Sequence, residues 1–532
     1  MKTPLARTLL ALCGISVLSA AEAPTKPQAI DAMKRATAFM TDKVAVYGGY
    51  VWSYLPDMSR RWGEMEARPT MIWLQAPGTA SMGHAFLDAL HASGDDFFYR
   101  AAESVASALI AVQHRSGGWH YIYDFAGAQS LHEWYDTVGR NGWRLEEYQH
   151  YYDNATFDDS TTTDCAEFML RLFLEKRDPK YRASLDRAIR FVLDSQYPSG
   201  GWPQRYPPAG EFSKDGLPDY TGFITFNDDV NAGNVDFLVK CYETLGDEKL
   251  LPAIRRGMDV FLATQQPAPQ AGWSLQHTTD LKPAGARSYE PKSLATHTTA
   301  SCIRKLIDFY ELTGDTKYLT RIPEALAWLD SVKLPPNTPG ARGSHPTFVE
   351  VGTNQPLYIH RTGSNVVNGR YFADHDSRNT IGHYSSFRMV DTAALRASYE
   401  KAKATPPGEL VKNSPLQPGR NPTSLPRYFS ASGGGPGPFG FGGPTGTPAE
   451  QAARVIAALD ADGRWLSPLR STSHPYTRDG AKEITPGDFG ATQVGDDTDT
   501  SPYRASPAVS GISTGAYIRN LDVLIRFLDA SR

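Results

Sequence analysis

Apolar residues recur along the chain with the spacing of one face of an α-helix. In the stretch Thr298–Thr313, Ile303, Leu306, Ile307 and Tyr310 fall at i, i+3, i+4 and i+7, the periodicity of an amphipathic helix. Comparable apolar stretches cover Ser81–Ser93, Thr162–Lys176 and Asn231–Leu245. The pattern therefore predicts a protein built mainly from helices.

A short turn segment follows each of these four stretches. The segments are Gly94-Asp95-Asp96-Phe97-Phe98, Arg177-Asp178-Pro179-Lys180-Tyr181, Gly246-Asp247-Glu248-Lys249-Leu250 and Gly314-Asp315-Thr316-Lys317-Tyr318. A second apolar stretch comes after each turn, for example Tyr181–Gln196 and Pro323–Val332. Self-similarity of this kind predicts an array of helical hairpins.

Three of the second helices end in a similar way, with glycine followed by tryptophan. The segments are Ser116-Gly117-Gly118-Trp119, Ser199-Gly200-Gly201-Trp202 and Ala271-Gly272-Trp273. Glycine ends helices because it adopts the left-handed conformation without a steric penalty. A single hairpin cannot bury its apolar stripe, so neighbouring hairpins must stack, either in an open solenoid or in a ring. Because the loops after Gly-Trp are long enough to form a cleft, we predict an all-α fold, an α/α toroid that forms an incomplete barrel. Short β-hairpins are expected at the cleft end.

The ends of the chain differ from this pattern. Lys2 and Arg7 precede an apolar run and a group of small residues, so residues 1–23 are predicted to be a signal peptide of a secreted or periplasmic protein. The toroid domain is expected over 27–400. Residues 405–448 are rich in proline and glycine and are interpreted as a flexible linker or lid. Residues 449–532 are expected to form a C-terminal helical extension.

The net charge of −4 shows no basic field over the whole chain, so nucleic acids and anionic membrane surfaces are poor partners. Beyond the leader no apolar run is long enough to cross a membrane, and we expect a monomer. A polyanionic substrate would need local arginines or a metal ion.

Aromatic residues make up 11% of the chain, which fits a well-filled core or carbohydrate binding. Cys165, Cys241 and Cys302 are too widely spaced for a zinc site and are interpreted as buried thiols.

Two loops before predicted helices concentrate carboxylates. Residues 151–159 include Asp158, and residues 222–230 include Asn227, Asp228 and Asp229. A helix N-cap explains one polar residue in each loop, but not adjacent carboxylates, which repel each other without a cation. Calcium prefers such oxygen ligands. Metal binding and helix capping are therefore both retained as interpretations of these residues. The acidic segment 495–499 lacks an EF-hand pattern and is interpreted as a solvated loop.

Two further segments carry isolated arginines. Residues 348–361 contain Asn354 and end in Arg361; read alone, they form a β-hairpin with a surface arginine. Arg287 precedes the fourth predicted repeat, and a salt-bridged or surface arginine is the simplest interpretation of it.

Taken together, these segments resemble the pectate lyases of polysaccharide lyase family 10. The resemblance is carried by three motifs: Gly200-Gly201-Trp202-Pro203-Gln204 with Ile224-Thr225-Phe226-Asn227-Asp228, then Ala286-Arg287-Ser288-Tyr289-Glu290-Pro291, then Glu350 to Asn354 with Arg361. It covers about residues 30 to 390. The family usually has arginines where Gln355 and Thr347 stand and an acidic residue where Thr362 stands.

The resemblance implies an α/α toroid that cleaves polygalacturonate by calcium-dependent β-elimination. It implies that Arg287 is the catalytic base and that Arg361 grips a substrate carboxylate. Asp158 and Asp228 correspond to acidic residues of the calcium and substrate site. We add Asp229 as a metal ligand because it adjoins Asp228, and Asn354 and Trp202 as substrate contacts.

Arginine is an unusual base because it normally stays protonated, so this assignment predicts an alkaline pH optimum. Two alternatives remain open at this point. A glycoside hydrolase on the same fold would use Asp158 and Asp228 as its carboxylate pair. A pectin-binding protein would bind polygalacturonate without cleaving it.

Overall fold

The computed structural model of the 532-residue chain describes residues 23–139, 146–210, 212–214, 216–362, 370–378, 380, 384–417, 422–429, 446–469 and 510–531. The predicted signal peptide, apart from Ala23, and the acidic segment 495–499 lie outside these residues.

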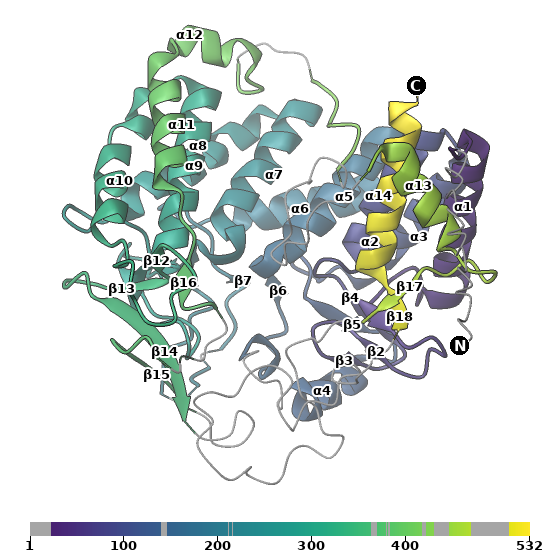
Figure 1. Ribbon diagram of the computed structural model, residues 1–532, viewed down its shortest axis with the longest axis horizontal. Coiled ribbons are helices and arrows are strands. Elements are labelled where there is room, and N and C mark those ends of the chain that lie inside the picture. Colours follow the sequence, from purple (N-terminus) through teal and green to yellow (C-terminus); the bar gives the residue numbers. More distant parts are fainter. Residues whose placement is uncertain are drawn as a thin grey trace, which may run out of the picture.

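Helices form most of the regular structure (Figure 1). They are α1 (Lys26–Phe39), α2 (Thr79–Ser93), α3 (Asp96–Val112), α4 (Ala128–Thr137), α5 (Thr161–Lys176), α6 (Pro179–Asp194), α7 (Val230–Leu245), α8 (Leu251–Thr264), α9 (Thr296–Thr313), α10 (Ile322–Ser331), α11 (Thr392–Ala404), α12 (Pro407–Leu410), α13 (Pro448–Ala457) and α14 (Thr514–Ala530). In Figure 1 they fan from α13, α14 and α1 on one side to α9, α10 and α11 on the other.

The strands are short and gather along the lower edge of the helices (Figure 1). They are β1 (Ser53–Tyr54), β2 (Arg61–Trp62), β3 (Glu66–Ala67), β4 (Met71–Trp73), β5 (Ile122–Asp124), β6 (Ala155–Thr156), β7 (Arg205–Tyr206), β8 (Ile224–Thr225), β9 (Gln276–His277), β10 (Pro283–Ala284), β11 (Ser293–Ala295), β12 (His345–Pro346), β13 (Phe348–Glu350), β14 (Pro356–Thr362), β15 (Arg370–Asp374), β16 (Phe387–Arg388), β17 (Leu466–Pro468) and β18 (Ser510–Ser513). All their pairings are antiparallel, and the longest sheet-forming hairpin is β14–β15.

The predicted turns between paired helices are confirmed. Each of the hairpins α2–α3, α5–α6, α7–α8 and α9–α10 ends its first helix with a left-handed residue, at Gly94, Arg177, Gly246 and Gly314. The aspartate that follows accepts a hydrogen bond from the backbone N–H two residues later, which caps the next helix. The repeated Gly-Asp pair thus specifies the turn chemistry of the fold.

The tryptophans of the Gly-Trp loops lie in the core. The indole N–H groups of Trp119, Trp202 and Trp273 donate to backbone carbonyls of the preceding helices, at 2.9, 2.7 and 2.9 Å. All three side chains are fully buried. Each tryptophan fixes the path of its loop back across the helix that precedes it.

The C-terminal part of the chain contributes a further hairpin of the same kind. Trp465 follows α13, and its indole N–H donates to the Val455 carbonyl at 2.9 Å, as in the other Gly-Trp loops. Gly463 lies against the backbone of α1, where a Cβ atom would come within 2.8 Å of the Arg35 carbonyl oxygen. Helix α14 packs between α1 and α2. Residues 449–532 were expected to form a C-terminal helical extension, and their described part includes two helices, α13 and α14, that pack against α1 and α2.

The proline- and glycine-rich stretch is corrected where the structure describes it. Residues 405–417 and 422–429 run over the C-terminal ends of the first helices of the hairpins. Ser414 donates to the Leu312 carbonyl at 2.6 Å, Thr423 N–H donates to the Glu243 carbonyl at 2.8 Å, and Phe429 N–H donates to Asp88 at 3.0 Å. These residues form a strap held to α9, α7 and α2 rather than a flexible linker.

The opposite end of the helices carries the long loops. The turns Asp158–Ser160 and Asn227–Asp229 lie directly before α5 and α7 and contact each other, and β11 lies directly before α9. The main core is a cluster of buried side chains that includes residues from α1 to α14, and a second, small cluster surrounds Tyr289 and Phe348. Within the part of the chain that the structure describes, no helix has the length and apolarity needed to cross a bilayer.

Candidate active site

Two equivalent turns place carboxylates before neighbouring helices. Asp159 and Ser160 before α5 have φ of 48° and 57°, and Asp228 and Asp229 before α7 have φ of 50° and 56°. Residues other than glycine occupy this left-handed region at a cost of about 1–3 kcal/mol each. The same strained geometry at repeat-related positions indicates that the surrounding loops hold these residues in place.

Arg287 lies at the centre of the carboxylates. Its guanidinium donates to Asp158 Oδ2 at 2.5 Å, to Glu290 Oε1 at 3.0 Å and to Glu147 Oε2 at 3.3 Å. Only 3% of the side chain is exposed. Burial by itself would lower the pKa of Arg287, but the Asp158 and Glu290 carboxylates raise it well above its usual value. In this arrangement Arg287 is a cation.

Asp158 is the anion of the group. Burial raises its pKa, but the Arg287 guanidinium and the Tyr121 hydroxyl, which donates to its Oδ2, outweigh burial and bring the pKa below its usual range. Its other oxygen, Oδ1, is buried and accepts no hydrogen bond from the described residues. The Asp228 carboxyl lies close enough to share a proton with Asp158.

The remaining carboxyls repel one another. Burial, followed by the charges of Asp159 and Asp158, raises the pKa of Asp228 well above its usual range. Burial and the Asp158 charge raise the pKa of Asp159 to about 7, and burial raises that of Glu147 to about 7 although Arg287 opposes it. The described site therefore has more carboxyl groups than cations to pair with them. Near neutral pH, either bound protons or a further cation must neutralise the unpaired carboxylates.

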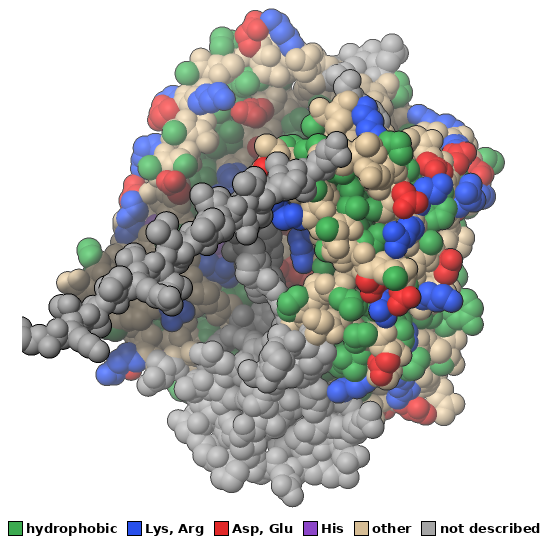
Figure 2. Space-filling view, turned by 45° about the vertical axis from the view of Figure 1, so that its right-hand side comes forward, with side chains coloured by type: hydrophobic (Ala, Val, Ile, Leu, Met, Phe, Trp, Pro, Cys, Tyr) green, Lys and Arg blue, Asp and Glu red, His purple; other side chains and the backbone are tan. Residues whose placement is uncertain are grey.

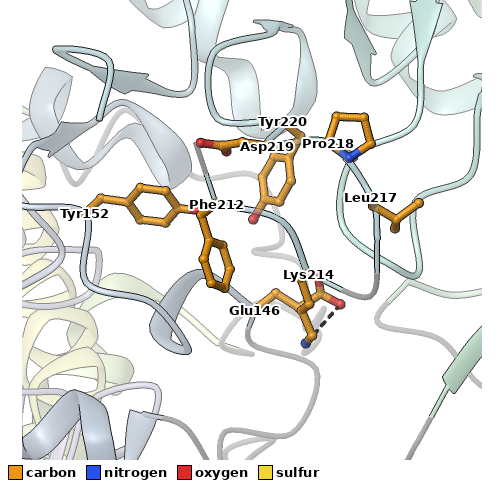
Figure 3. A pocket seen from close by; sticks show the side chains of 9 residues that line it. Glu146, Tyr152, Phe212, Lys214, Leu217, Pro218, Asp219 and Tyr220 are labelled. Carbon is orange, nitrogen blue, oxygen red and sulfur yellow. Dashed lines mark ion pairs between the residues drawn. The ribbon is translucent and has the colours of Figure 1, made fainter. Parts of the chain in front are cut away.

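Residues 212–214 and 216–220 lie on one side of Arg287. Tyr220 lies with its ring centre 5.6 Å from the guanidinium carbon, and Lys214 pairs with Glu146 at 3.5 Å. Figure 3 shows these side chains around a small cavity with Tyr152 and Phe212 on its other wall. The cavity holds about 10 Å³, room for one water molecule and not for a sugar ring. Access of a sugar to Arg287 from this side therefore requires the loop to move.

The structure brings together three of the predicted residues and separates others. Arg287, Asp158 and Asp228 meet as expected. Asp229 stays a predicted metal ligand. Its side chain is exposed, and the charges of Lys305, Asp236 and Arg304 act on it.

Two predicted substrate contacts are corrected. Trp202 is fully buried and cannot stack on a sugar. Asn354 closes the β13–β14 turn with φ of 61°, and its Oδ1 accepts from Gln270 at 2.7 Å and from the Trp328 indole at 3.0 Å. It therefore anchors a turn. Arg361 lies in β14 opposite Tyr371, and its side chain lies outside the described residues.

Sequence analysis missed several polar residues of the site. Glu64 accepts from Gln75 and from Tyr148, each at 3.1 Å, and Gln75 also donates to Asp159 at 2.5 Å. Glu147 comes from the segment before β6. These residues lie in segments outside the long helices, where no hydrophobic periodicity distinguishes them in the sequence. Glu290 belongs to the arginine motif, but sequence analysis did not identify it as a site residue.

The carboxyl cluster has the donor chemistry that calcium prefers, because it offers oxygen ligands only. The unpartnered Asp158 Oδ1 and the mutual repulsion of Asp159 and Asp228 are the features that a bound cation would relieve. No three Asp, Glu, His or Cys side chains stand ready as a metal-ligand set anywhere in the described ranges. The chemistry fits calcium, and the ligand geometry would have to form on binding.

Comparison with known families agrees with the motifs. Residues 137–370, which include Asp158, Asp228 and Arg287, match the family model for pectic acid lyase. The resemblance to pectate lyases is confirmed over this segment. No curated protein sequence matches the chain.

Several solved structures show partial similarity to the chain. A family 10 polysaccharide lyase from Cellvibrio cellulosa is 18% identical with a TM-score of 0.40, covering 61% of this chain and 97% of its own. A point mutant of that lyase in complex with trigalacturonic acid has the same identity and score and is covered over 98% of its length. An α-1,6-mannanase from a Salegentibacter species is 12% identical with a TM-score of 0.33, over 60% of this chain and 74% of its own.

Proposed function

We propose that the protein is a secreted or periplasmic pectate lyase that cleaves polygalacturonate by calcium-assisted β-elimination on an α/α toroid. The observation that carries the proposal is the pairing of Arg287 with Asp158 inside the segment that matches the pectic acid lyase model. A buried guanidinium at the loop end of the helices can pair with a negatively charged sugar acid when a further cation offsets the surrounding carboxylates.

β-Elimination removes the C5 proton of a uronate and expels the oxygen at C4. Arg287 is assigned to accept the C5 proton, and Arg361 to grip a uronate carboxylate. In the arrangement described above, neighbouring carboxylates, first Asp158 and then Glu290, keep Arg287 protonated. Arg287 must therefore leave these partners and lose a proton to solvent before it can accept the C5 proton. This requirement keeps the predicted optimum alkaline.

Calcium, when bound, would neutralise the uronate carboxylate and make the C5 proton more acidic. Asp158, Asp159 and Asp228 are the side chains that would hold it. They lie on the two equivalent turns before α5 and α7, on the same side of the helices as Arg287.

One observation supports a second candidate, a glycoside hydrolase. Asp158 has a lowered pKa and Asp228 a raised one, which is the split expected of a base and an acid in one site. A hydrolase needs no Arg287 in the reaction and no cation to neutralise a uronate.

Mass spectrometry of the products separates the two. Elimination gives a fragment with an unsaturated uronate, lighter by one water than the fragment that hydrolysis gives. We expect the lighter fragment from polygalacturonate; fragments of hydrolytic mass alone would support the hydrolase.

A further inference from the structure

Arg388 reaches the same site from a segment that follows the matched region. It lies in β16, whose partner β12 pairs His345 with Arg388. The segment leads into α11, just as the other site loops lead into α5, α7 and α9. Figure 2 shows the hollowed face of the molecule, with Lys and Arg side chains in and around the hollow.

Tyr384 connects Arg388 to the carboxyl cluster. Its hydroxyl donates to Glu290 Oε1 at 2.8 Å and accepts from Asn227 at 2.8 Å, and Asn227 also donates to Asp228 at 2.5 Å. The guanidinium carbon of Arg388 lies 5.8 Å from the centre of the Tyr384 ring. Arg388 therefore lies next to the residues that surround Arg287.

Two of the other described cations of the site are paired with carboxylates. Arg287 has three carboxylate partners, and Lys214 pairs with Glu146. Arg205 resembles Arg388 in having a buried Nε without an acceptor, but it is only 1% exposed and lies between the Tyr121 and Tyr152 rings. Arg388 is half-buried, so a ligand can reach it.

Among the described residues no carboxylate forms an ion pair with Arg388, and its Nε is buried without a hydrogen-bond acceptor. A half-buried guanidinium next to a sugar-acid site, with donors unused, has the geometry to bind a carboxylate in a bidentate manner.

We propose that Arg388 binds a carboxylate of polygalacturonate at a sugar neighbouring the one that is cleaved, and so sets the preference for unesterified substrate. The proposal rests on the proposed function for its substrate. Methyl esterification removes the charge and one acceptor oxygen, so an esterified sugar at this position loses the bidentate contact.

The experiment compares Arg388→Ala and Arg388→Lys with a control, Arg378→Ala. Arg378 is exposed on the same segment and bonds only to Asp376 in the described structure. KM and kcat are measured on polygalacturonate and on highly methyl-esterified pectin, and affinity for polygalacturonate is measured by gel retardation. Circular dichroism verifies that each variant is folded.

We expect Arg388→Ala to raise KM for polygalacturonate about tenfold or more and to change kcat much less, with a smaller effect on esterified pectin. Arg388→Lys should fall between Arg388→Ala and wild type, and Arg378→Ala should match wild type. Equal KM values and equal retardation for folded Arg388→Ala and wild type would overturn the proposal while leaving the lyase intact. If the wild type forms no unsaturated product but Arg388→Ala still weakens retardation, the lyase fails and Arg388 remains a carboxylate-binding residue.

Discussion

The guanidinium of Arg287 donates to Asp158 Oδ2 at 2.5 Å across 129 residues of sequence. One residue precedes α9 and the other precedes α5, so the bond joins loops from different hairpins. The stacking of the helices fixes the distance between these loops, and the loops need not find each other by themselves. The catalytic account depends on this relationship.

Replacing Arg287 by lysine tests its role without removing the charge. Lysine lacks the planar fork that pairs with Asp158, Glu290 and Glu147 together. We expect the rate of unsaturated-product formation to fall by about 10²–10⁴-fold, as for loss of an acid–base group, with the fold retained. Rates are measured by product absorbance, with Arg378→Lys as the exposed control. A variant with more than a tenth of wild-type activity would exclude Arg287 as the base.

Stability should depend on the ionisation of Glu147. Its pKa is about 7 in the folded protein, above the ordinary value near 4.3 in an unfolded chain. The protonated Glu147 carboxyl contributes fully to the free energy of unfolding below about pH 4, and this contribution is lost as the pH rises through about 7. The free energy of unfolding should therefore fall by about 1 kcal/mol or more between pH 5 and pH 8 because of Glu147. Urea unfolding at both pH values measures it. Glu147→Gln should reduce the pH dependence of the free energy of unfolding in this range. If the variant and the wild type show the same pH dependence, Glu147 is not the group responsible.

Trp202 should matter to stability and not to substrate binding. Trp202→Phe removes the bond to Val192 and part of a fully buried ring, at a cost of about 1–3 kcal/mol. Trp273→Phe is the matched control, because Trp273 occupies the equivalent position. Both variants should unfold at lower denaturant concentration with KM unchanged. A raised KM with unchanged stability in Trp202→Phe alone would restore a substrate role.

The C-terminal hairpin should be indispensable. A chain that ends at residue 429 loses α13 and α14, which exposes the faces of α1 and α2 and breaks the bond between Thr37 and Tyr517. We expect this chain to be digested rapidly by protease and to lack a cooperative thermal transition, whereas the full chain unfolds in one. A shortened chain with wild-type melting behaviour would show that the core ends before residue 449.

The hairpin array could be predicted because its signals are local. The Gly-Asp turns and Gly-Trp loops each have a fixed backbone geometry, and sequence alone reveals them. The last hairpin escaped because Gly463 and Trp465 follow a long proline- and glycine-rich stretch that hides the repeat. Trp202 was misassigned for a related reason: a residue that recurs at the same place in several hairpins serves the fold rather than one site.

The site was predicted only in part. Asp158, Asp228 and Arg287 stood out because adjacent carboxylates and a motif marked them. Glu147 and Glu64 left no such signal, because a buried charge in an irregular loop is recognisable only from its neighbours in space. Asp229 was chosen by adjacency alone, and its side chain is exposed.

The most direct test follows the ultraviolet absorbance of unsaturated uronates during incubation of the wild-type protein with polygalacturonate. Calcium is present at first, then removed by a chelator, and finally restored. The account predicts a rise that stops with the chelator and resumes with calcium. New reducing ends without any rise in absorbance would contradict it.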